Sequence, residues 1–299
     1  MVTLRKAIGY KPKEKAEVPE EAEGGEETEA DAEEQIPVNI CLCVDASLSM
    51  VPFEALEEFS QCLSVSRNPC LISFCLLNQQ LQTLSTGGKA HACAKDFNKL
   101  KYIVDPKGQF PQASEEGEGN ICHFFENTLQ KQFKEWDGVI GRGSLNVGET
   151  YIEQVYDNCF SLMCITPGTF AHVFTPQAII HTNLKHCKMG FLFDQCIGDN
   201  PFLEEKNAPP GHKFALEDHY DISTLLMLQG VKTVVVNSMT TNNLACTKFI
   251  ESFIESMGEG KGIAASVKDS SAIHKGVPDL PPHIPFAPVV YGLPNLTAK

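Results

Sequence analysis

Two short segments of the chain carry residue types that could together support nucleophilic chemistry. Ile165-Thr166-Pro167-Gly168 ends the apolar run 159–165, and Phe193-Asp194-Gln195-Cys196 ends a second apolar run, 189–193. In an α/β sheet the ends of two such strands can place a histidine beside a cysteine, which is the layout of a catalytic Cys–His dyad. Here the cysteine is Cys196, whereas the position expected to hold the histidine is Pro167. The two segments therefore predict a hydrolase-like scaffold without its general base.

Three other histidines lie between these segments in the sequence: His172, His181 and His186. Without an adjacent base the Cys196 thiol would be mostly protonated near neutral pH and a weak nucleophile. If the chain is active, His172 or His181 is the expected partner of Cys196. A surface or packed role is the simpler expectation for each histidine, so we predict no catalytic residue.

A second pattern, Asp45-Ala46-Ser47-Leu48-Ser49, follows the apolar run 38–44. In von Willebrand A domains this arrangement supplies one carboxylate and two hydroxyls to Mg²⁺, a cation that prefers oxygen ligands. A full site also needs a Thr and an Asp from other loops, and neither can be assigned here. We keep a metal site at Asp45, Ser47 and Ser49 as the weaker alternative, and we predict no cofactor.

Composition narrows the classes of function. The 299 residues have a net charge of −14, which argues against a nucleic-acid-binding surface and against anionic membranes. Residues 14–34 are rich in Glu, Asp, Ala and Gly, and we expect residues 1–35 to be a disordered acidic leader. That leader is a solvated spacer or a docking tail for a basic partner.

The cysteines and apolar runs predict an intracellular, cytoplasmic protein. The sequence has 12 cysteines, and several lie in or beside apolar runs, where cysteine acts as a small hydrophobe: Cys41, Cys43, Cys75, Cys164, Cys187 and Cys246. No signal peptide or membrane span is expected from the sequence, so a reducing compartment is favoured. The chain has no C-x-x-C pair, which argues against a structural zinc site.

The alternation of apolar runs and amphipathic segments predicts an α/β domain over residues 36–268, with a mainly parallel sheet flanked by helices on both faces. Strands are expected near 38–44, 100–104, 159–165, 189–193 and 231–236. Helices are expected near 120–136, 150–156, 176–182, 221–229 and 242–257. Residues 269–299 contain most of the late prolines, and we expect an extended Pro-rich tail there.

Several of these segments, in order, resemble the CHAT and separase-type domains of the caspase-like fold. The segments are Val51-Pro52-Phe53-Glu54-Ala55-Leu56, Ser64-Val65-Ser66-Arg67, the strand that leads to Cys196, and the helix and strand over 225–237. The resemblance covers roughly residues 38–268. It implies a caspase-like fold, and it aligns the T-H-G turn of the family with Thr166-Pro167-Gly168, so that the catalytic histidine of the family is a proline here.

Within this superfamily, Ser64-Val65-Ser66-Arg67 and Lys101-Tyr102-Ile103-Val104-Asp105-Pro106 most resemble a scaffold component of the ciliary axoneme, in its central apparatus. The resemblance implies a non-catalytic scaffold module whose partners are other proteins, including axonemal ones, with neither nucleic acid nor membrane as a partner. The alternative is an active CHAT-type cysteine peptidase that uses Cys196 with a displaced histidine. The weaker alternative is a metal-dependent binding domain of the von Willebrand A type.

Overall fold

A computed structural model describes residues 38–84, 97–110, 120–141, 147–196, 219–274 and 284–297. The expected acidic leader, residues 1–35, lies outside the described residues. None of the described helices is long and apolar enough to cross a lipid bilayer.

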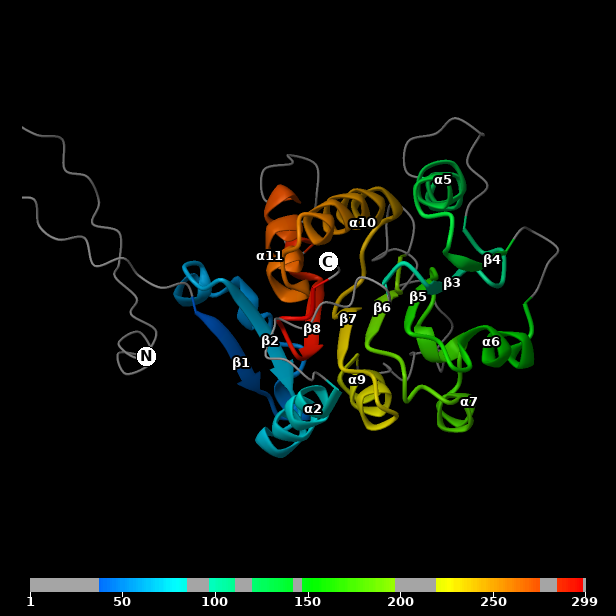
Figure 1. Cartoon of the computed structure of the whole chain (residues 1–299). Coiled ribbons are helices and arrows are strands. Elements are labelled where there is room, and N and C mark those ends of the chain that lie inside the picture. The colour runs from blue at the N-terminus through cyan, green and yellow to red at the C-terminus, as the bar shows by residue number, and fades with distance from the viewer. Residues whose placement is uncertain are drawn as a thin grey trace, which may run out of the picture.

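One sheet of eight strands forms the centre of the described part (Figure 1). From one edge to the other its strands are β1 (Asn39–Cys43), β2 (Ser64–Asn68), β8 (Pro288–Gly292), β7 (Thr233–Asn237), β6 (Met189–Phe193), β5 (Ser161–Ile165), β3 (Leu100–Val104) and β4 (Asp137–Ile140). Neighbouring strands are parallel except for β7 and β8, which are antiparallel. The predicted α/β class and mainly parallel sheet are thus confirmed.

The antiparallel pair divides the sheet into two groups of strands. β1, β2 and β8 run in one direction, and β3 to β7 run in the other. The carboxyl ends of β1 and β2 therefore lie at one end of the strands, and the carboxyl ends of β5 and β6 lie at the other end. As a result, the two segments singled out by the sequence, around Asp45 and around Cys196, lie at opposite ends of the sheet, measured along its strands.

Helices cover both faces of the sheet (Figure 1). One face carries α10 (Asn243–Gly258), α11 (Ile263–His274) and a helix from Ile121 to Gln132, which consists of α4 (Ile121–Phe124), a π-helical turn (Phe125–Leu129) and α5 (Gln130–Gln132). The other face carries α2 (Leu71–Leu84), α6 (Glu149–Tyr156), α7 (Pro176–His181) and α9 (His219–Leu228). The short 3-10 helices 46–48, 53–55 and 57–59 connect β1 to β2.

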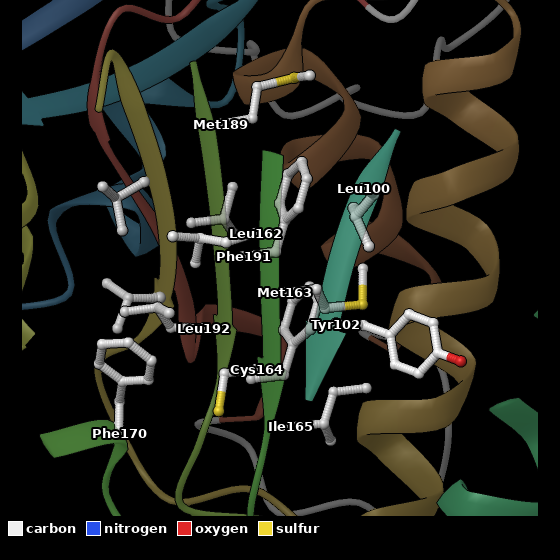
Figure 2. Close-up of a cluster of buried hydrophobic side chains, with 14 of the residues drawn as sticks. Leu100, Tyr102, Leu162, Met163, Cys164, Ile165, Phe170, Met189, Phe191 and Leu192 are labelled. Carbon is white, nitrogen blue, oxygen red and sulfur yellow. The ribbon is translucent and has the colours of Figure 1, made fainter. Parts of the chain in front are cut away.

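The central strands are buried on both faces, as continuous apolar runs require. Every residue of β5, β6, β7 and β8 is buried. Along β5, Leu162 and Cys164 point to one face, whereas Met163 and Ile165 point to the face that α10 covers (Figure 2). Burying an aliphatic or aromatic side chain of this size contributes about 1.5–3 kcal/mol to stability, so this double-sided core dominates the folding energy.

The expected Pro-rich tail is wrong for its described part, because β8 lies between β2 and β7. Pro288 stands at the first position of the strand, where the missing N–H is tolerated, and Val289, Val290 and Tyr291 provide the strand-forming side chains. The helix α11 also extends the domain past residue 268, to His274. The helix α2 and the strand β4 were likewise not predicted from the sequence.

Candidate functional site

The structure brings the Pro167 turn and the Cys196 segment together, as the sequence predicted. β5 and β6 pair in parallel, with Ile165 opposite Phe193, so their carboxyl ends lie side by side. Backbone hydrogen bonds then join the two loops: the Cys196 N–H donates to the Thr166 carbonyl at 3.3 Å, and the Gln195 N–H donates to the Gly168 carbonyl at 2.9 Å. Open α/β sheets bind their ligands at the carboxyl ends of their strands, which is where these two loops lie.

The Cys196 side chain points into the core and not toward solvent. Gln195 has a φ of 55°, in the left-handed region, and the chain then continues into a bridge between Cys196 and Thr241. The Cys196 thiol has 0% exposure and lies 3.3 Å from the Phe193 carbonyl oxygen, to which it donates a weak hydrogen bond. Its other neighbours include the carbonyl oxygen of Asp194, at 3.7 Å, and the thiol of Cys246 on α10.

Burial raises the pKa of the Cys196 thiol well above its ordinary value, and the neighbouring Cys246 and Asp194 raise it further. The effect has a simple cause, because a thiolate would lose its hydration and face a carboxylate. At neutral pH this arrangement favours the protonated thiol, which is the poorer nucleophile.

The two histidines proposed as displaced bases have different surroundings from Cys196. His172 is exposed, and its Nδ1 lies 3.0 Å from the hydroxyl of Thr169. His181 is exposed in the last turn of α7. Among the described residues, the polar groups recorded around the Cys196 thiol belong to Phe193, Asp194, Cys246 and Cys164, and none is a histidine.

Asp194 is a buried residue beside Cys196 for which the sequence suggested no role of its own. Its carboxylate accepts a hydrogen bond from the Phe170 N–H at 3.1 Å, and its carbonyl accepts one from the Asn237 side chain at 2.8 Å. Asp194 therefore ties the ends of β6 and β7 to the turn that follows Pro167. A polar residue directly after an apolar strand was the available signal.

A small cavity lies beside this site. Its volume is about 10 Å³, close to the minimum that holds one water molecule. The cavity is lined mainly by apolar side chains: Phe193, Asn237, Thr241, Ala245, Cys246, Phe249, Ile284 and Pro288.

The candidate metal residues lie at the other edge of the sheet, after β1. The Asp45 carboxylate accepts hydrogen bonds from the Ser47 hydroxyl at 2.6 Å and from the Ser47 N–H at 2.9 Å, and these bonds lower the pKa of Asp45. Asp45 and Ser47 are exposed, whereas Ser49 is 1% exposed. Asp45 thus caps the 3-10 helix 46–48. Within the described ranges, no three His, Cys, Asp or Glu side chains are grouped so that they could hold a metal ion.

The loop between β1 and β2 is held by a buried arginine. Arg67, at 0% exposure, forms a bidentate ion pair with Glu54 and donates to the backbone carbonyls of Ser49 and Val51. Burial alone would lower the pKa of Arg67, but the hydrogen bond and charge of Glu54 outweigh it and leave the pKa raised. This pair joins two of the segments that carry the family resemblance, 51–56 and 64–67.

The arrangement of the sheet and its helices defines the class, which is the caspase-like fold. The domain is similar in structure to separase in the Saccharomyces cerevisiae separase–securin complex, with a TM-score of 0.58 and 16% identity, over 85% of this chain and 15% of that one. It is also similar to the Arg-specific cysteine proteinase gingipain R, with a TM-score of 0.50 and 11% identity, over 78% of this chain and 55% of that one.

In sequence, the chain is similar to cilia- and flagella-associated protein 46 of Chlamydomonas reinhardtii. The two are 24% identical over an alignment of 255 positions, which covers 74% of this chain and 9% of that protein. The chain therefore matches only a small part of this relative's length. No family model matches the chain.

Proposed function

We propose that this chain is a non-catalytic protein-interaction module with a caspase-like fold, and that it works as a scaffold component of the ciliary axoneme. The observation that carries the proposal is Pro167 at the end of β5, beside the Cys196 segment at the end of β6. This is where the resemblance places the histidine of the family. Proline has no titratable side chain, so it cannot act as a general base.

The environment of Cys196 supports the same proposal. A peptidase cysteine needs a thiolate, a base that forms it and a polar group that stabilises the oxyanion. Burial and the Asp194 charge act against the thiolate, because both raise the thiol pKa. The thiol also donates to the carbonyl of its own strand end, which gives it a packing role.

The axonemal part of the proposal is supported by similarity to a cilia- and flagella-associated protein, and the match covers most of this chain. The second candidate function is a CHAT-type cysteine peptidase with a displaced histidine. The observation in its favour is that Cys196 stands at the end of a strand in a fold shared with a cysteine proteinase.

The proposal is tested by expressing tagged protein in ciliated cells and extracting the cilia with detergent. Both the wild type and Cys196→Ala should remain with the axoneme in equal amounts, because the thiol contributes only packing. A Cys196→Ala protein that folds but leaves the axoneme, or a wild type absent from it, would contradict the proposal.

A further inference from the structure

The large apolar side chains that remain exposed in the described part of the chain are concentrated in one region. Most lie between residues 38 and 76: Val38, Leu48, Met50, Val51, Leu56, Leu63, Leu71, Ile72 and Leu76. Scattered exposed apolar residues need no explanation, but a concentration of them marks an interaction site. We name Leu48, Met50, Val51, Leu71, Ile72 and Leu76 the α2 patch.

The helix α2 contributes the larger part of the patch. Its sequence, LISFCLLNQQLQTL, contains no charged residue. Leu71, Ile72 and Leu76 are 65%, 71% and 52% exposed, while Leu77 on the inner side is buried in the core. A surface helix normally carries polar or charged residues on its outer face, and a helix that is apolar on both sides is normally covered. The outer face of α2 therefore has the composition of an interface.

The loop between β1 and β2 contributes Leu48, Met50 and Val51 to the patch, and it is held in one conformation. Arg67, at the end of β2, binds the carbonyls of Ser49 and Val51 and so fixes the loop beside the start of α2. The buried ring of His219, on α9, also lies 3.2 Å from the Ser49 carbonyl oxygen. A surface that is already ordered loses less conformational entropy when it binds.

Within residues 38–84 the exposed charges have one sign. Asp45 lies three residues before Leu48, and Glu57 lies later in the connection between β1 and β2; both are exposed. Within residues 38–84, Arg67 is the one Lys or Arg in the sequence, and its side chain is fully buried against Glu54. Lys232 donates to Gln80 of α2 but is itself buried. Lys268 donates to the carbonyls of Phe59, Ser60 and Cys62, close in sequence to Glu57, so Asp45 is the charge that flanks the apolar centre. Two copies of the chain would bring like charges together here.

We propose that the α2 patch binds a basic amphipathic helix of a partner protein. Apolar residues of that helix, at spacings of three and four, would pack on Leu71, Ile72 and Leu76, as in helix-in-groove recognition. Its Lys and Arg side chains would lie beside Asp45. The inference rests on the proposed function, since it assumes that the domain acts by binding. The two can fail separately, because a reactive Cys196 would end the proposed function and leave this surface unchanged.

The test uses the full chain and a fluorescent synthetic peptide of Leu, Ala, Lys and Arg, with Leu at helical spacing. A peptide of the same composition in a non-amphipathic order is the control. Binding is followed by anisotropy as sodium chloride is raised. We expect the amphipathic peptide to bind more tightly than its isomer, and Ile72→Asp and Leu76→Asp each to weaken binding by about tenfold or more. Ile180→Asp, at an exposed position on α7, should leave binding unchanged.

The charge contribution has its own variant. Asp45→Asn removes the charge and keeps an oxygen acceptor for the Ser47 cap, so binding should weaken several-fold and depend less on salt. Thermal melting checks that each variant is folded. If the Ile72→Asp protein does not fold, Ile72→Ser is used in its place.

Three outcomes would overturn the proposal. The first is peptide binding that is absent, or that Ile72→Asp and Leu76→Asp leave unchanged. The second is a dimer in sedimentation that Ile72→Asp dissociates, because the occupant would then be a second copy. The third is tighter peptide binding after Arg5→Glu with Lys6→Glu in the full chain, because the chain's own basic segment would then be the competitor.

Discussion

Arg67 is the largest of the described side chains that are completely buried, and it lies at the end of a strand beside a loop. A buried charge is costly unless it is paired and its other donors are satisfied. Here the guanidinium finds a carboxylate at Glu54 and two backbone carbonyls, at Ser49 and Val51. The residue therefore acts as the anchor of the β1–β2 loop.

We predict that Arg67→Met destabilises the protein by about 3–5 kcal/mol, because it leaves the Glu54 carboxylate without its partner and removes one donor from each of two carbonyls. Arg67→Lys should recover little, since a single ammonium cannot reproduce the bidentate fork. The measurement is denaturant unfolding followed by circular dichroism. Unfolding midpoints within experimental error of the wild type for both variants would show that the pair is not an anchor.

At the same scale, the juxtaposition of Pro167 and Cys196 could be predicted from the sequence, because each segment ends a recognisable apolar strand. The contacts that set the chemistry of Cys196 could not be predicted in this way. The approach of Cys246 depends on how α10 packs on the sheet, and the Asn237 bond to Asp194 depends on strand order. Neither appears in any local pattern.

At the scale of the element, β8 is the part of the fold that the sequence obscured most. Prolines around residues 278–294 indicate an extended tail, yet residues 288–292 form a strand that pairs with β7 along its whole length. Gly292 closes the strand with a φ of 93°, and a Cβ there would lie 2.2 Å from the Lys232 carbonyl oxygen. The strands β1, β3, β5, β6 and β7 were predictable because each is an apolar run between turn residues, whereas β4 is short and half exposed.

The position of β8 leads to a prediction. Val290→Asp should prevent stable folding, because it places an unpaired carboxylate at a residue with 1% exposure between two other strands. Leu228→Asp, at a residue with 78% exposure on α9, is the matched control and should change stability by less than about 0.5 kcal/mol. Soluble yield and the thermal unfolding midpoint report both effects. A Val290→Asp protein as stable as this control would show that β8 is not part of the sheet.

At the scale of the whole molecule, the core holds an unusual set of buried acidic protons. Burial raises the pKa of the thiols of Cys164, Cys187 and Cys196 and of the phenol of Tyr156. These groups keep their protons in the folded state at a pH where they lose them in the unfolded state. Their contribution to stability is complete below the unfolded pKa and falls above it.

The free energy of unfolding should therefore decrease above about pH 8.5, where an unfolded thiol begins to ionise. The slope is about 1.4 kcal/mol per pH unit for each group that stays protonated when folded. Urea unfolding from pH 7 to pH 10 measures it. Cys164→Ala should start from a lower stability and show a shallower slope. A free energy that stays constant across this range would contradict the picture of buried, protonated thiols.

The opposite directions of the two strand groups also separate the two surfaces of interest. Cys196 lies at the carboxyl ends of β5 and β6, and the α2 patch lies at the opposite end of the strands, beside the carboxyl ends of β1 and β2. Changes at Ile72 and at Cys196 are therefore expected to act independently on binding and on thiol reactivity.

The proposal that Cys196 does not act as a nucleophile is tested most directly by site-resolved labelling with iodoacetamide at pH 7, measured by mass spectrometry. Cys43, Cys70 and Cys75 are exposed and serve as internal references. Cys70 should react first, because the Ser73 N–H, 3.4 Å from its sulfur, lowers the pKa of this thiol. We predict that Cys196 stays unlabelled while these three react. Labelling of Cys196 faster than of Cys70, lost on His172→Ala or His181→Ala, would contradict the account and identify an active cysteine peptidase.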